Sequence, residues 1–173
     1  MNFQIRSSTP KDFKKIIELQ THSLRNLSPN YNSTQIESLV RSQASARSAE
    51  DEISFVAEYE HEILGFASFL KQKSQISGIY VHPSFIRQGI GTKLLELVEK
   101  IAIDGGDKAI YVTSSLSTVT FYQANGYQLI RQSGFYSEEK IWIPCINLEK
   151  QLINIPDTQK LFQCLYYYFF SSK

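Results

Sequence analysis

The segment RQGIGT, Arg87–Thr92, is the part of the sequence best suited to bind a charged group. Gly89 and Gly91 let the backbone turn so that its N–H groups converge. The amphipathic pattern that follows predicts a helix, whose first turn leaves N–H groups unpaired and carries partial positive charge. Several such amides acting together, with Arg87 adding a charge-assisted contact, favour a bound anion such as a diphosphate.

Two glycines are weak evidence by themselves, because a GxG turn at the start of a helix is usually structural. The segment lacks the GxxxxGK[ST] pattern of loops that bind nucleoside triphosphates. No βαβ unit offers a clear candidate for the acidic residue that holds the ribose in a dinucleotide fold. The residues around the loop must therefore decide which anion it binds.

Two longer segments supply that context. Residues 78–95, GIYVHPSFIRQGIGTKLL, place VxP before the loop and GIGxxLL within it, and residues 114–127, SSLSTVTFYQANGY, carry a Phe-Tyr pair followed by Gly and an aromatic residue. In this order the two segments resemble the acetyl-CoA-binding motifs of the GNAT superfamily of N-acetyltransferases. The resemblance covers most of residues 1–150. It implies an enzyme in which the loop binds the pyrophosphate of the co-substrate acetyl-CoA.

The resemblance also implies roles for single residues. Tyr122 matches the family's proton donor to the departing thiolate, and Ser115 matches a residue that holds the pantetheine arm. Residues 79–81 would offer backbone groups to the pantetheine amides, much as an added strand does. The predicted acetyl-CoA-binding set, which includes no metal ligand, is Ile79, Tyr80, Val81, Arg87, Gln88, Gly89, Ile90, Gly91, Thr92 and Ser115.

A general base is harder to identify, although an alkylammonium with a reference pKa near 10.4 must lose a proton before it attacks. Family members usually carry Gln or Arg where Ile86 stands, and several use Glu where Ile110 stands. The candidates are His22, Tyr31, Glu58, His82 and a water chain to a remote carboxylate. A non-catalytic CoA-binding or interaction module with the same fold is therefore an alternative to the enzyme, and an α+β domain with a fortuitous GxG loop is a third.

The composition argues against several other classes. The chain has 173 residues, enough for one substantial domain, and its formal net charge of +1 does not favour nucleic acid as a partner. The first residues lack an apolar run with a small-residue cleavage site, so we expect a cytoplasmic protein. Cys145 and Cys164 lie outside both motifs, which favours direct acetyl transfer over an acetyl-cysteine intermediate and supports neither a disulfide framework nor a zinc site.

Hydrophobic periodicity predicts the elements that position these residues. Strand patterns cover residues 3–7, 53–59, 63–70, 75–81, 109–113, 127–131 and 141–148. Helical patterns begin after Thr9, at Ser33 or Thr34, after Gly89 and at Ser117. We expect an α+β (mixed α/β), GNAT-like fold, with a central, mostly antiparallel mixed sheet of six to seven strands, splayed in the middle and flanked by about four helices.

The predicted N-acetyltransferase domain spans residues 1–155, and an aromatic C-terminal tail spans residues 156–173. The tail contains LFQCLYYYFF, about half the length needed to cross a bilayer as a helix, so we expect it to pack on the domain or on a second subunit rather than contact a membrane. A homodimer formed through residues 141–148 or through the tail is a hypothesis. The acceptor, a primary amine of a small molecule or peptide, should lie over residues 22–50 and the loops near Gly134–Lys140.

Overall fold

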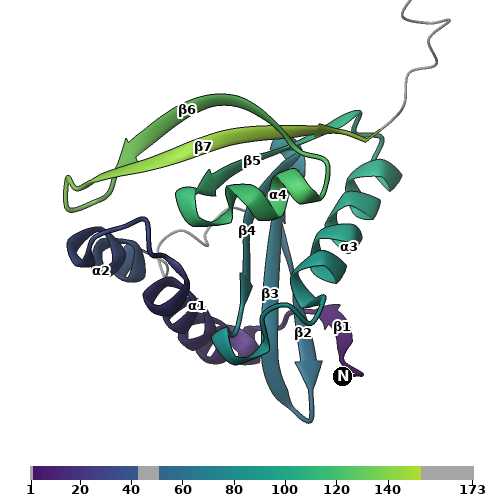
Figure 1. Ribbon diagram of the computed structural model, residues 1–173. Coiled ribbons are helices and arrows are strands. Elements are labelled where there is room, and N and C mark those ends of the chain that lie inside the picture. The colour runs from purple at the N-terminus through teal and green to yellow at the C-terminus, as the bar shows by residue number, and fades with distance from the viewer. Residues whose placement is uncertain (1, 43–50, 153–173) are drawn as a thin grey trace, which may run out of the picture.

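A computed structural model describes residues 2–42 and 51–152 of the chain (Figure 1). The predicted aromatic tail, Cys164 and most of the polar segment 42–52 lie outside the described residues. None of the described helices combines the length and the hydropathy needed to span a bilayer.

Seven strands form one sheet in the order β1-β2-β3-β4-β5-β7-β6. They are β1 (Gln4–Ser7), β2 (Glu52–Tyr59), β3 (Glu62–Leu70), β4 (Gln75–Val81), β5 (Ala109–Ser115), β6 (Gln128–Tyr136) and β7 (Trp142–Gln151). Every neighbouring pair is antiparallel except β4 and β5, which run parallel. The predicted mostly antiparallel mixed sheet is thus confirmed.

Four α-helices flank the sheet: α1 (Phe13–Leu27), α2 (Ser33–Ser42), α3 (Ile90–Asp104) and α4 (Val119–Ala124). Figure 1 shows α1 and α2 on one side of the sheet and α3 on the other. α3 connects β4 to β5, which is the crossover that a parallel pair requires. The predicted number of helices is confirmed.

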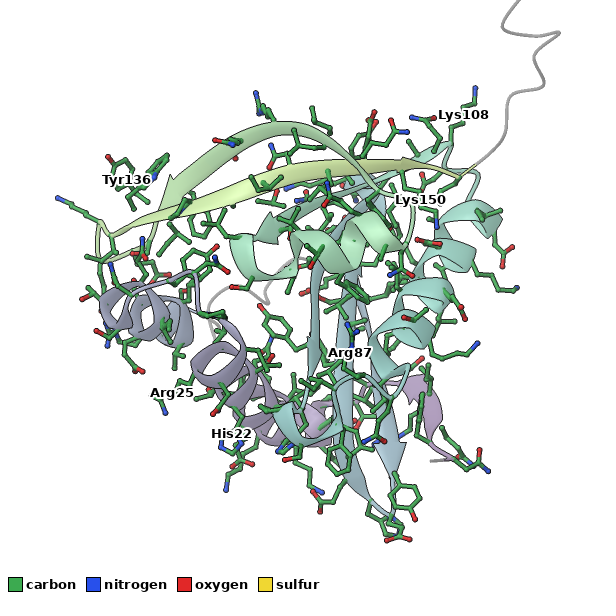
Figure 2. All side chains as sticks on the ribbon, in the orientation of Figure 1. His22, Arg25, Arg87, Lys108, Tyr136 and Lys150 are labelled. Carbon is green, nitrogen blue, oxygen red and sulfur yellow. The ribbon has the colours of Figure 1, made fainter. Side chains whose placement is uncertain are left out.

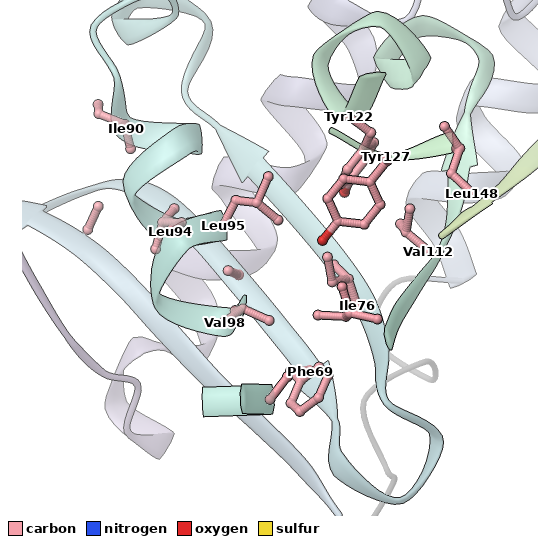
Figure 3. Close-up of a cluster of buried hydrophobic side chains, with 14 of the residues drawn as sticks. Phe69, Ile76, Ile90, Leu94, Leu95, Val98, Val112, Tyr122, Tyr127 and Leu148 are labelled. Atoms are coloured by element: carbon pink, nitrogen blue, oxygen red, sulfur yellow. The ribbon is translucent and has the colours of Figure 1, made fainter. Parts of the chain in front are cut away.

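Two apolar cores hold these layers together. The larger lies between the sheet and α3, where the helix buries Leu94, Leu95 and Val98 at its 3.6-residue period against Phe69 and Ile76 of the strands (Figure 3). The smaller lies on the opposite face, where α1 packs on β2 and β3. Its buried members are Ile16, Leu19, Val56, Ile63 and Phe66. Strand side chains therefore alternate between the two helical layers.

The sheet is splayed between β4 and β5. Their register contains only two pairs, Gln75 with Tyr111 and Ile76 with Val112, although each strand has seven residues. Beyond Ile76, β4 keeps its pairing with β3 and leaves β5. The predicted splay in the middle of the sheet is therefore present, and it leaves one edge of β4 open from Ser77 to Val81.

The last two strands are longer than the sequence patterns indicated. β6 continues to Tyr136 rather than ending at Arg131, because it pairs with β7 as far as Trp142. Gly134, which was expected in a loop, lies inside β6, where a Cβ atom would come within 2.3 Å of the Trp142 ring. Gly134 lets the Trp142 ring approach the backbone and does not form a turn. Of the loop expected near Gly134–Lys140, only the hairpin turn between β6 and β7 remains.

Candidate active site

A cavity of about 700 Å³ occupies the opening between β4 and β5. Its walls come from β4, the loop before α3, the first turn of α3, β5, α4 and one side of α1. Of the predicted acetyl-CoA-binding residues, all line this cavity except Gln88, and Tyr122 lines it as well. The fold therefore brings segments more than 40 positions apart in the sequence to one space.

The open edge of β4 directs backbone groups into this cavity. The His82 N–H donates to the Leu64 carbonyl oxygen at 2.9 Å, so His82 and Leu64 form a hydrogen-bonded pair of the antiparallel ladder. Such pairs alternate along a ladder, so the intervening Ile79 and Val81 point their N–H and C=O groups away from β3. Since β5 has already diverged, those groups face the cavity.

The backbone N–H groups of the loop before α3 converge, as the glycine pattern predicted. Arg87 and Gly89 both have left-handed backbone conformations, with φ of 62° and 81°. The Lys93 N–H donates to the Gly89 carbonyl oxygen at 2.9 Å, which starts the helical ladder and leaves the preceding amides of the first turn without helical acceptors. Arg87 adds an exposed guanidinium at the same place (Figure 2). This arrangement can bind an anion.

Tyr122 lies at the inner wall of the cavity with only 4% of its surface exposed. Its ring packs edge-on against Phe121 and Tyr127, with centroids 5.1 and 5.3 Å away. Burial, with a smaller contribution from Tyr80, raises the pKa of the Tyr122 phenol above its ordinary value. Among the described residues the hydroxyl has no hydrogen-bond partner, so it keeps its proton and can donate it to a ligand.

A short hydroxyl cluster closes the end of β5. The Ser115 hydroxyl shares a hydrogen bond of 2.9 Å with the Thr118 hydroxyl, and the Ser114 hydroxyl makes another of 2.9 Å with the same group. Both Ser115 and Thr118 line the cavity. These polar contacts hold the start of α4 against the end of β5.

None of the four side chains considered as a general base lines this cavity. The Tyr31 hydroxyl donates to the Pro144 carbonyl at 2.7 Å and accepts from the Leu116 N–H at 3.1 Å, so it ties the segment between α1 and α2 to β7 and to the residue after β5. Glu58 is ion-paired with Arg6 at the other end of the sheet. His82 accepts a bond from the Ser84 N–H at 3.2 Å, and its ring contacts His22. Burial and His22 lower the pKa of His82.

A second cavity of about 350 Å³ adjoins the first and shares Leu24, Ser77, Gly78 and Tyr80 with it. Two of its polar residues, Gln20 and Glu52, were not singled out from the sequence. Gln20 could have been noticed, because it is a polar residue on the buried, apolar side of an amphipathic helix. No local sequence pattern pointed to Glu52, because it stands at the start of a strand beside a polar segment.

Comparisons with known proteins agree with this geometry. The model of the acetyltransferase (GNAT) domain matches residues 24–152. A solved GCN5-related N-acetyltransferase from Rhodopseudomonas palustris is 24% identical with a TM-score of 0.80, over 87% of this chain and 96% of that one. PaiA N-acetyltransferase from Thermoplasma acidophilum, in complex with coenzyme A, is 20% identical with a TM-score of 0.69, over 87% and 99%.

An aminoglycoside 6'-N-acetyltransferase complexed with coenzyme A is 19% identical with a TM-score of 0.61, over 89% of this chain and 99% of that one. A comparison with curated protein sequences finds no match. The structural likenesses show the fold, and the domain model covers more than half of the sequence. The chain therefore belongs to the GNAT family of acetyltransferases.

Proposed function

We propose that the protein transfers the acetyl group of acetyl-CoA directly to a primary amine of a small molecule or peptide. The observation that carries the proposal is the cavity between β4 and β5. It brings an unpaired strand edge, a set of converging loop amides and an unpartnered tyrosine hydroxyl to one space. Acetyl-CoA is the acetyl donor, and these three features match its pantetheine amides, its diphosphate and its thioester.

The backbone supplies most of the binding. The amides from Arg87 to Thr92 hold the diphosphate, and Ile79 and Val81 bond the pantetheine amides as a neighbouring strand would. Ser115 lies at the opposite wall within the same cavity. Because main-chain groups make these contacts, the hydrophobic side chain of Ile86 does not remove them.

The transfer proceeds by attack of a neutral amine nitrogen on the thioester carbonyl carbon. The ammonium first loses a proton to solvent, and the C–N bond then forms. The nitrogen releases its second proton to solvent as the C–S bond breaks to leave a thiolate. A free N–H of β4 can polarise the carbonyl oxygen. Tyr122 donates a hydrogen bond to the departing sulfur and passes it a proton late, and solvent restores the phenol. The reference pKa values of a phenol and a thiol make full proton transfer uphill by about 2 kcal/mol, and burial of Tyr122 increases that barrier.

A screen of amines with acetyl-CoA, monitored by release of the free thiol, tests this function. Amine-dependent thiol release with formation of an N-acetyl product is the expected result. Binding of acetyl-CoA in calorimetry without acetylation of any small-molecule amine or peptide would instead favour the non-catalytic CoA-binding module. No binding of acetyl-CoA at all would contradict both.

Gly89→Ala is expected to weaken acetyl-CoA binding by roughly fivefold. Gly89 has φ of 81°, a conformation that costs alanine about 1–2 kcal/mol, so the loop should relax and misdirect its amides. Gly106→Ala is a matched control, because Gly106 has φ of 89° and, like Gly89, open space where a Cβ would stand, but lies at the other end of α3. Thermal unfolding should show similar destabilisation of both variants, whereas calorimetry should show weaker binding only for Gly89→Ala. Equal binding by the two variants would contradict the assignment of the loop.

We also propose that the protein is cytoplasmic and forms a homodimer. Each chain would consist of a domain over residues 1–155 and a tail over residues 156–173. β7 lies between β5 and β6, so its backbone edges are already paired, whereas β6 is the open edge of the sheet. Leu129 and Ile130 of β6 are about half exposed. A second copy of the chain can therefore bind along β6 or through the tail more easily than it can pair with β7. Light scattering of the full chain should give twice the monomer mass, and a monomeric mass at high concentration would contradict the dimer.

A further inference from the structure

The second cavity lies on the α1 side of the sheet, where β4 separates from β5. Its lining comes from β2, β3 and β4, from α1 and α2, and from the end of the β6–β7 hairpin. Figure 1 shows that end of the hairpin close to α2. It meets the acetyl-CoA cavity at Ser77, Gly78 and Tyr80. A molecule in the smaller cavity can therefore reach the thioester from the side opposite α3.

Gln20 lines this cavity and carries an unsatisfied acceptor. Only 4% of the residue is exposed, and its Oε1 atom has no hydrogen-bond partner among the described residues. A buried polar atom without a partner is uncommon in folded proteins, because it has lost its hydration without compensation. Gln20 lines the cavity, so a ligand that carries a donor would satisfy it.

Glu52 faces the same cavity from β2. Ile53 and Phe55 pack in the core beneath α3, whereas Val56 packs beneath α1, so the even-numbered positions of β2 point to the α1 side. Within residues 2–42 and 51–152, the carboxylate of Glu52 has no hydrogen bond or ion pair. The half-buried Glu99, by contrast, is paired with Lys150 at 2.7 Å. Glu52 is therefore available to a cationic ligand.

The charge of the cavity favours a cation. Its described lining contains the carboxylates of Glu52 and Glu138, the second of which already has an interaction of its own, and no Lys, Arg or His. The rings of Tyr80, Phe135 and Tyr136 provide apolar and π faces, which suit an alkyl chain that ends in a positive charge. An anionic or zwitterionic amine would place its carboxylate against that of Glu52.

Glu52 also lies away from the place where transfer occurs. Gly78 pairs with Ser68 in β3, and Ser68 pairs with Ser54 in β2, so Glu52 is two strands from Gly78 and two residues further along. At the usual strand spacing, this separates the two backbones by roughly 12 Å. Even with the reach of its side chain, Glu52 is better placed to hold a second cationic group than the reacting nitrogen.

We propose that the smaller cavity selects, as acetyl acceptor, a small amine that carries a second cationic group. The reacting amine lies near Gly78 and Tyr80, Glu52 holds the distal cation, and Gln20 Oε1 accepts a hydrogen bond from an N–H of the same ligand. This inference rests on the proposed acetyl transfer and adds the class of acceptor to it.

Three five-carbon amines with the same reacting group test the proposal with the full chain: cadaverine, n-pentylamine and δ-aminovalerate. We expect kcat/KM for cadaverine to exceed that for n-pentylamine by roughly tenfold, and δ-aminovalerate to be the poorest substrate. In Glu52→Gln the preference for cadaverine over n-pentylamine should fall to about twofold or less, mainly through a higher KM, while the KM for acetyl-CoA stays unchanged. In Gln20→Leu the KM for cadaverine should rise while the protein becomes no less stable.

Glu18→Gln is the matched control, because Glu18 lies on the exposed face of α1 and outside both cavities. It should keep the wild-type preference. Equal use of the three amines, a preference for δ-aminovalerate, or an unchanged preference in Glu52→Gln would overturn the proposal while leaving acetyl transfer intact. If no amine is acetylated, the proposed function fails, and calorimetry of cadaverine with the CoA-loaded protein still decides whether Glu52 binds a dication.

Discussion

Tyr122→Phe is expected to lower kcat by roughly 10²–10⁴, with the affinity for acetyl-CoA retained. The substitution removes only the hydroxyl, which lines the acetyl-CoA cavity and has no partner within the described part of the chain. The ring remains to pack against Phe121 and Tyr127, so the fold should be preserved. Steady-state rates give the loss in kcat, and calorimetry gives the dissociation constant for acetyl-CoA.

Tyr127→Phe is the matched control for this result. Tyr127 is as deeply buried as Tyr122 and belongs to the same aromatic cluster, but it does not line the cavity. Its hydroxyl also has no hydrogen-bond partner among residues 2–42 and 51–152. Burial, with a contribution from Glu99, raises its pKa, so its phenol is neutral. Its loss should leave turnover within about twofold of wild type, because no donor to the thioester is removed. Unchanged turnover in Tyr122→Phe would exclude Tyr122 as the acid.

Gly91→Leu is expected to weaken acetyl-CoA binding by roughly 10–100-fold, through the side chain that it inserts into the cavity. Gly91 stands in the first turn of α3, where a Cβ atom would lie 3.4 Å from the Phe121 ring and 3.5 Å from a Val81 methyl group. A Cβ alone makes ordinary contacts there. The further carbons of leucine must occupy space between residues that line the acetyl-CoA cavity.

Gly91→Ala separates this effect from damage to the helix. Alanine fits the available space and has a higher helix propensity than glycine, so its binding should stay within about threefold of wild type and its melting temperature should not fall. Competition with a fluorescent CoA analogue measures both variants. Wild-type affinity in Gly91→Leu would show that the coenzyme does not pass this turn of α3.

The two faces of the sheet divide the work of the proposed enzyme. On the α3 side, we propose that main-chain groups of the loop and of β4 bind acetyl-CoA, which requires few particular side chains. On the α1 side, the lining includes the side chains of Gln20 and Glu52, which we propose select the acceptor. The open edge of β4 joins the two sites.

Local patterns in the sequence were sufficient for the acetyl-CoA side of the molecule. A left-handed glycine before an amphipathic helix, and a Phe-Tyr pair on a short helix, are contained in segments of 14 to 18 residues. Both are formed by interactions between near neighbours, so periodicity and glycine position predict them. The order of strands and helices followed from the same signals. The family and its mixed sheet were predicted from the resemblance of residues 78–95 and 114–127 to the GNAT motifs, and both are confirmed.

Contacts between distant segments decided what the sequence left open. Tyr31 was a candidate base until its hydroxyl was found between Pro144 and Leu116, 113 and 85 positions away. Glu52 and Gln20 can be recognised as candidate site residues only in the folded chain, where β2 and α1 line one cavity. Local spacing records which face of an element a residue occupies, but the residue across from it depends on sheet order, register and the divergence of β4 from β5. Those are properties of the packed chain as a whole, so the proposed acceptor side could be inferred only from the tertiary structure.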